Sequence, residues 1–168
     1  MPGTRDGEIE HAAIIGAEVT LDELLDAWRA NCGINLELLA LCTDEDLELK
    51  PGKGKTIRSN YVHLIGVRRA YLEDKMRKEA ASVAKLDWKT ASREELTDGL
   101  RQTDGLIERL FRKMEESAKP GRYTTIKFFA YVVAHEAHHR SQIEIALRLN
   151  GREPPDAVLY QLWEWSKK

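Results

Sequence analysis

The stretch TTIKFFAYVVAHEAHHRSQIEIALRL occupies residues 124–149 and contains neither proline nor glycine. Its apolar residues, such as Phe128 and Val132, recur at helical spacing and form one stripe. His135 and His139 lie on the same stripe, and an Asn-Gly pair follows the stretch as a C-terminal stop. We therefore predict one long helix that turns its apolar face, with both imidazoles, toward a protein core.

Capping signals upstream of this stretch indicate three more long helices. The sequence TLDE places Glu23 three residues after Thr20, and SREE places Glu95 three residues after Ser92, which is the spacing of a capping box. Between these two helices, Thr56 follows a break rich in Pro and Gly and can cap a further helix. We expect that second helix to continue into the low 80s.

No stretch of the chain shows the alternating pattern of a strand, an internal repeat or a linker long enough to separate domains. The predicted fold is therefore all-α: a four-helix bundle with a short C-terminal helix, in one domain over residues 1–168. Residues 1–18 are expected to form a loosely ordered N-terminal segment. Trp163 and Trp165 are expected to cap one end of the bundle, with a dimer contact or a pocket wall as the alternative.

Composition narrows the class of protein. The 168 residues carry a net charge of −2, which argues against a dedicated nucleic-acid binder. The longest apolar run, residues 128–134, is too short to cross a membrane, and two cysteines are too few for a disulfide framework, so we expect a cytoplasmic protein. Residues 1–49 carry two basic and twelve acidic side chains, whereas residues 50–89 carry eleven basic and four acidic ones. We expect the acidic first helix to pack beside the basic second one, and the alternative is a basic surface that attracts an anionic small molecule.

Three histidines form a candidate metal site. His135 and His139 are four residues apart, so on a helix they lie on one face and can bind the same ion. His63 lies on the predicted second helix, on a face shared with apolar residues, and supplies a third imidazole. Three imidazoles leave open coordination positions, as in reactive metal centres, and both zinc and nickel suit such ligands. The alternative is that these histidines are hydrogen-bonded core residues without a metal.

Four other side chains are candidates for supporting roles. Asn60 and Gln142 each lie about one turn from a candidate ligand and are expected to support it or to contact the substrate, and His138 lies at the border of the histidine stripe. Glu136 is a candidate catalytic base, because residues 135–139 match the H-E-x-x-H pattern of zinc peptidases. Against that role, Glu136 lies about 100° round the helix from the preceding histidine. His11 has no partner in the sequence and is taken as incidental.

The chain resembles the DinB/YfiT-like superfamily in three segments that occur in the family's order. They are YVHLIG at residues 61–66, HEAHHRSQI at 135–143 and LRLNGREPP at 147–155. The resemblance covers nearly all of residues 20–165, with Ser141 where the family often has glycine. It implies a bundle in up-down-down-up order, often dimeric, that holds a divalent metal through three histidines. The family's ligand positions fall on His63, His135 and His139.

Family members of known activity are largely metal-dependent enzymes that use low-molecular-weight thiols, such as bacillithiol transferases and mycothiol-dependent isomerases, and many members have no assigned activity. The resemblance therefore implies a thiol-dependent transferase or isomerase that contains zinc or nickel and acts, as a homodimer, on a small electrophile. Neither Cys32 nor Cys42 belongs to the histidine site, so the thiol would come from a cofactor. Two alternatives stay open, a small-molecule metal hydrolase and a non-catalytic metal-binding bundle.

Overall fold

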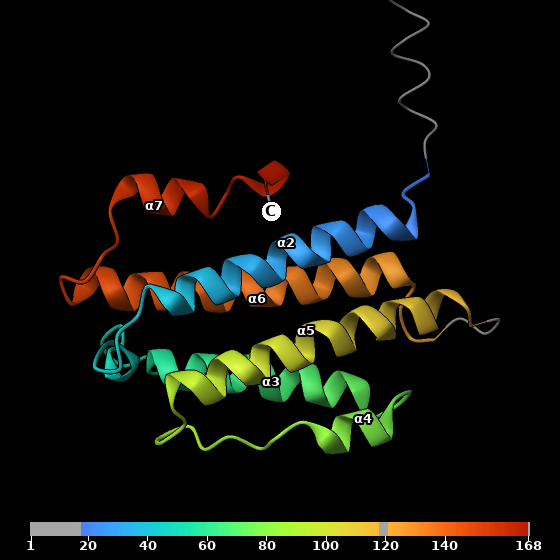
Figure 1. Cartoon of the computed structure of the whole chain (residues 1–168), viewed down its shortest axis with the longest axis horizontal. Coiled ribbons are helices and arrows are strands. Elements are labelled where there is room, and N and C mark those ends of the chain that lie inside the picture. Colours follow the sequence, from blue (N-terminus) through green and yellow to red (C-terminus); the bar gives the residue numbers. More distant parts are fainter. Residues whose placement is uncertain (1–17, 118–120, 168) are drawn as a thin grey trace, which may run out of the picture.

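The computed structural model describes residues 18–117 and 121–167, which form helices joined by loops and contain no strand (Figure 1). The all-α prediction is confirmed for these residues. The four long helices are α2 (Leu21–Ala40), α3 (Ile57–Leu72), α5 (Arg93–Glu115) and α6 (Thr125–Leu149). Two short α-helices, α4 (Arg77–Ser82) and α7 (Asp156–Gln161), and two 3-10 turns at Asp46–Glu48 and Trp165–Lys167 complete the description.

The long helices begin where their capping residues predict. Thr20 and Ser92 both form complete capping boxes, in which the hydroxyl accepts a backbone hydrogen bond and the glutamate three residues on bonds back. Thr56 accepts a hydrogen bond from the backbone N–H of Ser59, which begins α3. These contacts satisfy amide groups that a helix start otherwise leaves unpaired. The predicted helix starts are therefore confirmed.

The predicted end of the second helix is wrong. Helix α3 stops at Leu72, and a turn separates it from α4 instead of one helix continuing into the low 80s. The turn allows Met76, Ala80 and Val83 to reach the core, where all three are buried. An irregular segment, residues 83–92, then returns along the bundle to the start of α5. In Figure 1 the colours run one way along α2 and α6 and the opposite way along α3 and α5.

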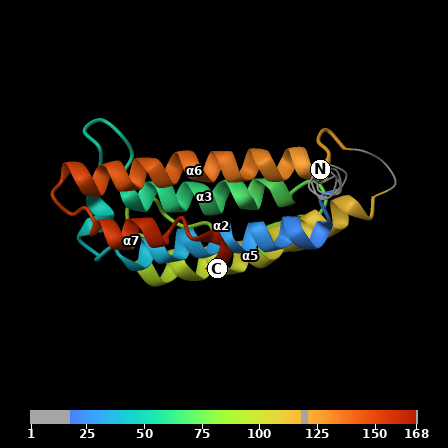
Figure 2. The same ribbon diagram turned by 90° about the horizontal axis from the view of Figure 1, so that it is seen from above.

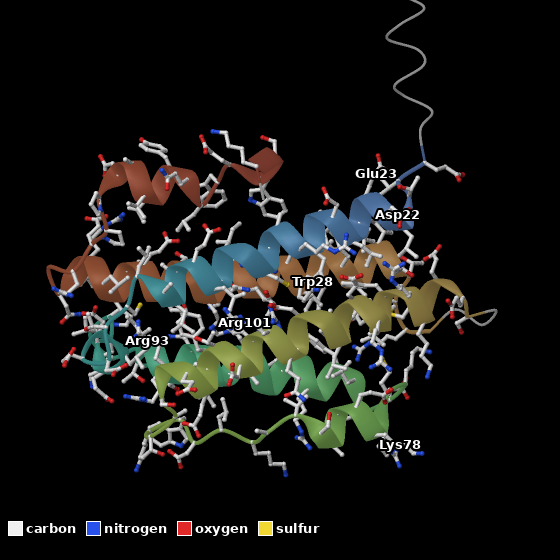
Figure 3. The ribbon with its side chains drawn as sticks, in the orientation of Figure 1. Asp22, Glu23, Trp28, Lys78, Arg93 and Arg101 are labelled. Atoms are coloured by element: carbon white, nitrogen blue, oxygen red, sulfur yellow. The ribbon has the colours of Figure 1, made fainter. Side chains whose placement is uncertain are left out.

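The packing of the helices corrects the expectation drawn from charge. Helix α2 packs against α5 and α6, and α3 packs against the same two helices, so α2 and α3 lie at diagonal corners (Figure 2). The acidic first helix therefore does not pack chiefly beside the basic second one. The apolar faces decide the arrangement: Trp28 of α2 points toward α5, where its indole N–H donates to the Asp104 carbonyl at 3.0 Å (Figure 3). Its ring also meets Phe111 edge-on at 5.6 Å.

The C-terminal segment lies along the side of the bundle formed by α2 and α6 (Figure 1). Leu162 is buried and Trp165 packs partly against the core, but Trp163 is 67% exposed. The prediction that Trp163 and Trp165 cap one end of the bundle is therefore wrong, because the segment lies along its side, with Leu162 and not Trp163 taking the inward position. The predicted loose N-terminal segment, apart from Glu18, and His11 lie outside the described residues.

Among the described helices, none has both the length and the apolar composition that crossing a bilayer requires.

Candidate metal centre

Helices α3 and α6 bring the three candidate ligands together. The ring centre of His63 lies 5.4 Å from that of His135 and 4.6 Å from that of His139. The rings of His135 and His139, one turn apart on α6, lie 4.7 Å from each other. One nitrogen from each imidazole belongs to a group whose atoms all lie within 4.8 Å of one another. A single ion between the helices can therefore be reached by all three side chains.

The orientation of His139 is set by a buried hydrogen bond. Its Nδ1 lies 2.9 Å from Oδ1 of Asn60, which is fully buried on α3. The Asn60 amide is itself oriented, because its Nδ2 donates to the backbone carbonyl of Thr56 at 3.1 Å. The amide oxygen can only accept, so Nδ1 of His139 carries the proton and Nε2 keeps a free lone pair. This is the arrangement in which a metal-binding histidine is held by a supporting side chain.

The environment keeps the three imidazoles neutral. Burial, reinforced by the neighbouring histidines and Lys55, lowers the pKa of His139 to about 4. Burial also lowers the pKa of His63 and of His135, and the positive charge of Lys55 acts in the same direction on both. A neutral imidazole is the form that binds a metal, so the ligands need not lose protons first at neutral pH.

The donor set fits a zinc or nickel ion. The three ligand atoms are all imidazole nitrogens, which suit both metals, and three protein ligands leave coordination positions for a further group. The chain's own thiols take no part, because Cys32 and Cys42 are buried away from this group. Burial raises the pKa of the Cys32 thiol well above its usual value and that of Cys42 to about 12, so neither is a ready thiolate.

His138 and Gln142 lie on the exposed side of α6. The His138 ring meets the His139 ring edge-on, with 5.1 Å between centres. The Gln142 side-chain nitrogen lies 2.8 Å from Nε2 of His138. His138 therefore lies at the border of the histidine group. Gln142 contacts His138 and none of the three candidate ligands, whereas Asn60 contacts the candidate ligand His139.

Glu136 is held inside the bundle by other side chains. It is 1% exposed, and its Oε1 and Oε2 accept from Nε and Nη2 of Arg68 at 2.6 and 2.9 Å. The side-chain amides of Asn31 and Asn35 also donate to Oε2, each at 2.7 Å. Burial alone would raise the pKa of Glu136, but Arg68 and the two amides lower it below its ordinary value. Because both oxygens are engaged, the geometry gives no support to Glu136 as a catalytic base.

The polar network around Glu136 links all four long helices, and the sequence reading missed it. Arg140 of α6 donates to Oδ1 of Asn31 and Asn35 at 2.7 and 3.0 Å. Arg68 of α3 also donates to the Thr103 hydroxyl of α5 at 3.1 Å. The sequence does contain one sign of this network, which is the spacing of its polar residues. Helix α2 carries Asn31 and Asn35 four residues apart, and α6 carries Glu136 and Arg140 at the same interval.

This network also fixes how α6 is rotated. Glu136 and Arg140 directly follow His135 and His139 in the sequence. Successive residues on a helix point about 100° apart. Anchoring Glu136 and Arg140 inside the bundle therefore leaves the two histidines facing α3.

Replacing Asn60 with alanine is expected to weaken metal binding about 10- to 100-fold, because His139 loses the acceptor that fixes its ring and proton. The measurement is a competition titration with a chelating dye on purified protein. Gln142→Ala is the matched variant and should change the affinity less than about twofold, because Gln142 contacts His138 instead of a candidate ligand. Equal affinity of Asn60→Ala and the unmodified protein would contradict the supporting role.

The chain was compared with protein-family models, curated proteins and solved structures. No curated protein and no solved structure matches the chain. The family model described as "DinB family" matches residues 17–167, which is nearly the whole chain. The helical bundle and the group of three histidines agree with the resemblance seen in the sequence. On this evidence the chain belongs to the DinB family.

Proposed function

We propose that this chain is a divalent-metal-dependent enzyme that uses a low-molecular-weight thiol for group transfer to, or isomerisation of, a small electrophile. The observation that carries the proposal is the meeting of His63, His135 and His139, with their ligand atoms within 4.8 Å of one another. Membership of the DinB family supports a metal-binding role for this group. The proposal includes the up-down-down-up order of the family, which is supported by the helix directions in Figure 1.

The roles of the residues follow from their positions. His63, His135 and His139 would hold a zinc or nickel ion, which supplies a positive centre that lowers the pKa of a thiol bound beside it. Asn60 keeps the proton of His139 on Nδ1, so Nε2 stays free to bind. His63 and His135 are only half-buried, which leaves their side of the site open to a thiol and an electrophile.

The proposal also covers the oligomeric state, the cellular location and the partners of the protein. We propose a cytoplasmic homodimer that acts on a small molecule and binds neither nucleic acid nor a membrane. The net charge of −2 supports the absence of a nucleic-acid partner, since such proteins carry strongly basic surfaces. Two free, buried cysteines are consistent with a reducing compartment.

The test uses protein purified without an affinity tag and loaded with zinc or with nickel. Bacillithiol, mycothiol, glutathione and cysteine are each offered with a panel of small electrophiles, and thiol consumption is followed. We expect turnover with at least one thiol, about 100-fold faster than for metal-free protein, because the metal stabilises the charge that develops on sulfur. A His63→Ala variant should lose this turnover.

Two other outcomes would replace the proposal. Hydrolysis of esters or amides without any thiol would identify a metal hydrolase, and the engaged carboxylate of Glu136 means that another group would have to act as the base. Stoichiometric metal that alters stability but supports no turnover across both panels would identify a non-catalytic metal-binding bundle.

A further inference from the structure

The candidate ligands on α6 are held in two different ways. The His139 ring is fixed by a hydrogen bond to the buried side chain of Asn60. His135, by contrast, forms no hydrogen bond through its ring with any residue in 18–117 and 121–167. It is also only half-buried, so core packing does not enclose its ring. The orientation of the His135 imidazole therefore depends on the rings that lie against it.

One of these rings is not a candidate ligand. The rings of His63 and His139 lie 5.4 and 4.7 Å from that of His135, and both belong to the group that can bind the ion. The remaining neighbour is Tyr131, which lies outside that group. Its ring is nearly parallel to the imidazole, with 22° between planes and 6.3 Å between centres, which is an offset stack.

Helix α6 itself brings Tyr131 and His135 together. The two residues are four positions apart, and side chains at that interval are neighbours on one face of a helix. Side chains on a helix also lean toward its N-terminus, so the imidazole leans over the turn that carries the tyrosine. The stack therefore follows from local geometry and is in place before an ion binds.

The Tyr131 ring is held in turn by two other tyrosines. Tyr123 stacks on it with 6.1 Å between centres and 8° between planes, and Tyr71 of α3 meets it edge-on at 6.1 Å. Tyr71 also meets the buried ring of Phe128 edge-on at 5.2 Å, which anchors this set of rings to the core. These contacts restrict the rotation of Tyr131, so it presents a fixed surface to His135.

The exposure of Tyr131 argues against a purely structural role. Its side chain is 48% exposed, so its burial contributes less to folding than that of a core residue. Leucine is also a better helix former than tyrosine, so helix propensity does not favour an aromatic residue at this position. The candidate ligand on which the ring stacks gives it a role that these two considerations do not.

We propose that Tyr131 is a positioning residue of the metal centre, whose ring holds the His135 imidazole in the orientation that meets the ion shared with the other two histidines. This inference rests on the proposed function, because it requires the three histidines to bind a metal. A ligand that is already oriented loses less rotational freedom on binding. A bound cation also makes the imidazole more positive, and the electron-rich face of the tyrosine then attracts it more strongly.

The first measurement is the zinc affinity of the full chain, determined by competition with a chelating dye. Tyr131→Leu removes the ring and keeps an apolar side chain, and it should weaken zinc binding about three- to tenfold, the size of one aromatic contact. Tyr131→Phe keeps the ring and should bind zinc within about twofold of the unmodified protein. Tyr131→Met, which also lacks a ring, provides the same test if the leucine variant does not fold.

The second measurement is the visible absorption of the cobalt-loaded protein. Cobalt(II) accepts the same imidazole ligands, and its absorption bands respond to the geometry of the coordinating atoms. We expect Tyr131→Leu to change these bands at saturating cobalt and Tyr131→Phe to keep them. A change in stability alone would not alter the bands of folded, fully loaded protein. Urea unfolding of each metal-free variant measures that stability separately.

The matched control is Tyr160→Leu. Tyr160 lies on α7, is 73% exposed and has no ring partner within the described part of the chain. Its replacement should change neither the zinc affinity nor the cobalt bands. Losses of equal size in Tyr160→Leu and Tyr131→Leu would overturn the inference, because the effect would then not depend on the stack with His135.

The remaining outcomes separate this inference from the proposed function. Equal zinc affinity and identical cobalt bands in Tyr131→Leu and the unmodified protein overturn the inference and leave the metal-dependent function standing. A loss in Tyr131→Phe as large as that in Tyr131→Leu also overturns it, because the hydroxyl and not the ring would be responsible. Failure of the unmodified protein to bind zinc or cobalt overturns both proposals.

Discussion

Replacing His139 with alanine is expected to lower the zinc bound by the purified protein from about one ion per chain to less than about one tenth of that. His139 is the most buried of the three candidate ligands, and Asn60 holds its ring. Its removal leaves His63 and His135, and two imidazoles hold zinc too weakly to survive dialysis. His63→Ala should give the same result, because it removes the only ligand that α3 contributes. The measurement is elemental analysis after dialysis against metal-free buffer.

The matched control is His138→Ala. His138 is adjacent in the sequence and its ring touches that of His139, but it lies outside the group of three and is exposed. This variant should keep its zinc. Zinc content that is equal in His139→Ala and the unmodified protein would show that the metal binds elsewhere. If the unmodified protein takes up neither zinc nor nickel, the three histidines are polar core residues and do not form a metal site.

Replacing Arg68 with methionine is expected to lower the free energy of unfolding by about 3–5 kcal/mol, the usual cost of removing one partner from a buried ion pair. Arg68 and Glu136 are each 1% exposed and form two hydrogen bonds with each other. Methionine restores much of the side-chain volume, so the loss reports chiefly on the carboxylates of Glu136 and Asp104, which lose their shared cation. Urea unfolding followed by circular dichroism gives the value.

Two further variants test the origin of this loss. Arg29→Met removes an ion pair with Glu108 in which the arginine side chain is 55% exposed, and it should cost at most about 1 kcal/mol. The double variant Arg68→Met with Glu136→Leu should be less destabilised than Arg68→Met alone, because the buried Glu136 carboxylate is no longer left without its cation, whereas Asp104, the other acidic partner of Arg68, is unpaired in both variants. A double variant as unstable as the sum of both single changes would contradict the ion-pair explanation.

The effect of Arg68→Met should also depend on pH. The pKa of Glu136 is lowered in the folded protein from its ordinary value of 4.5, so its contribution to stability is complete well above that pH. It is lost as the pH falls through the lowered folded value. The difference in stability between the unmodified protein and Arg68→Met should therefore narrow below about pH 4.5. A difference that stays constant down to pH 3 would argue against the charge of Glu136 as its source.

Local sequence patterns were sufficient to place the starts of the long helices and to put two of the three candidate ligands on one helix face. Thr20 and Ser92 begin their helices through hydrogen bonds to residues three positions away, so a short window of sequence contains the whole interaction. The shared face of His135 and His139 follows from the helical repeat alone. These features depend on neighbours within one turn, and local rules are sufficient to predict them.

Packing between the helices sets which side chains meet across the bundle. The distance of His63 from the pair on α6, the hydrogen bond from His139 to Asn60, and the partners of Glu136 all join separate helices. Helix packing likewise placed α2 and α3 at diagonal corners, although their charges had indicated neighbours. The physical reason is that burial of the apolar faces sets the relative position of the helices, and the polar contacts depend on that position. A sequence lists the residues that can pair, but only the packed bundle determines which of them do.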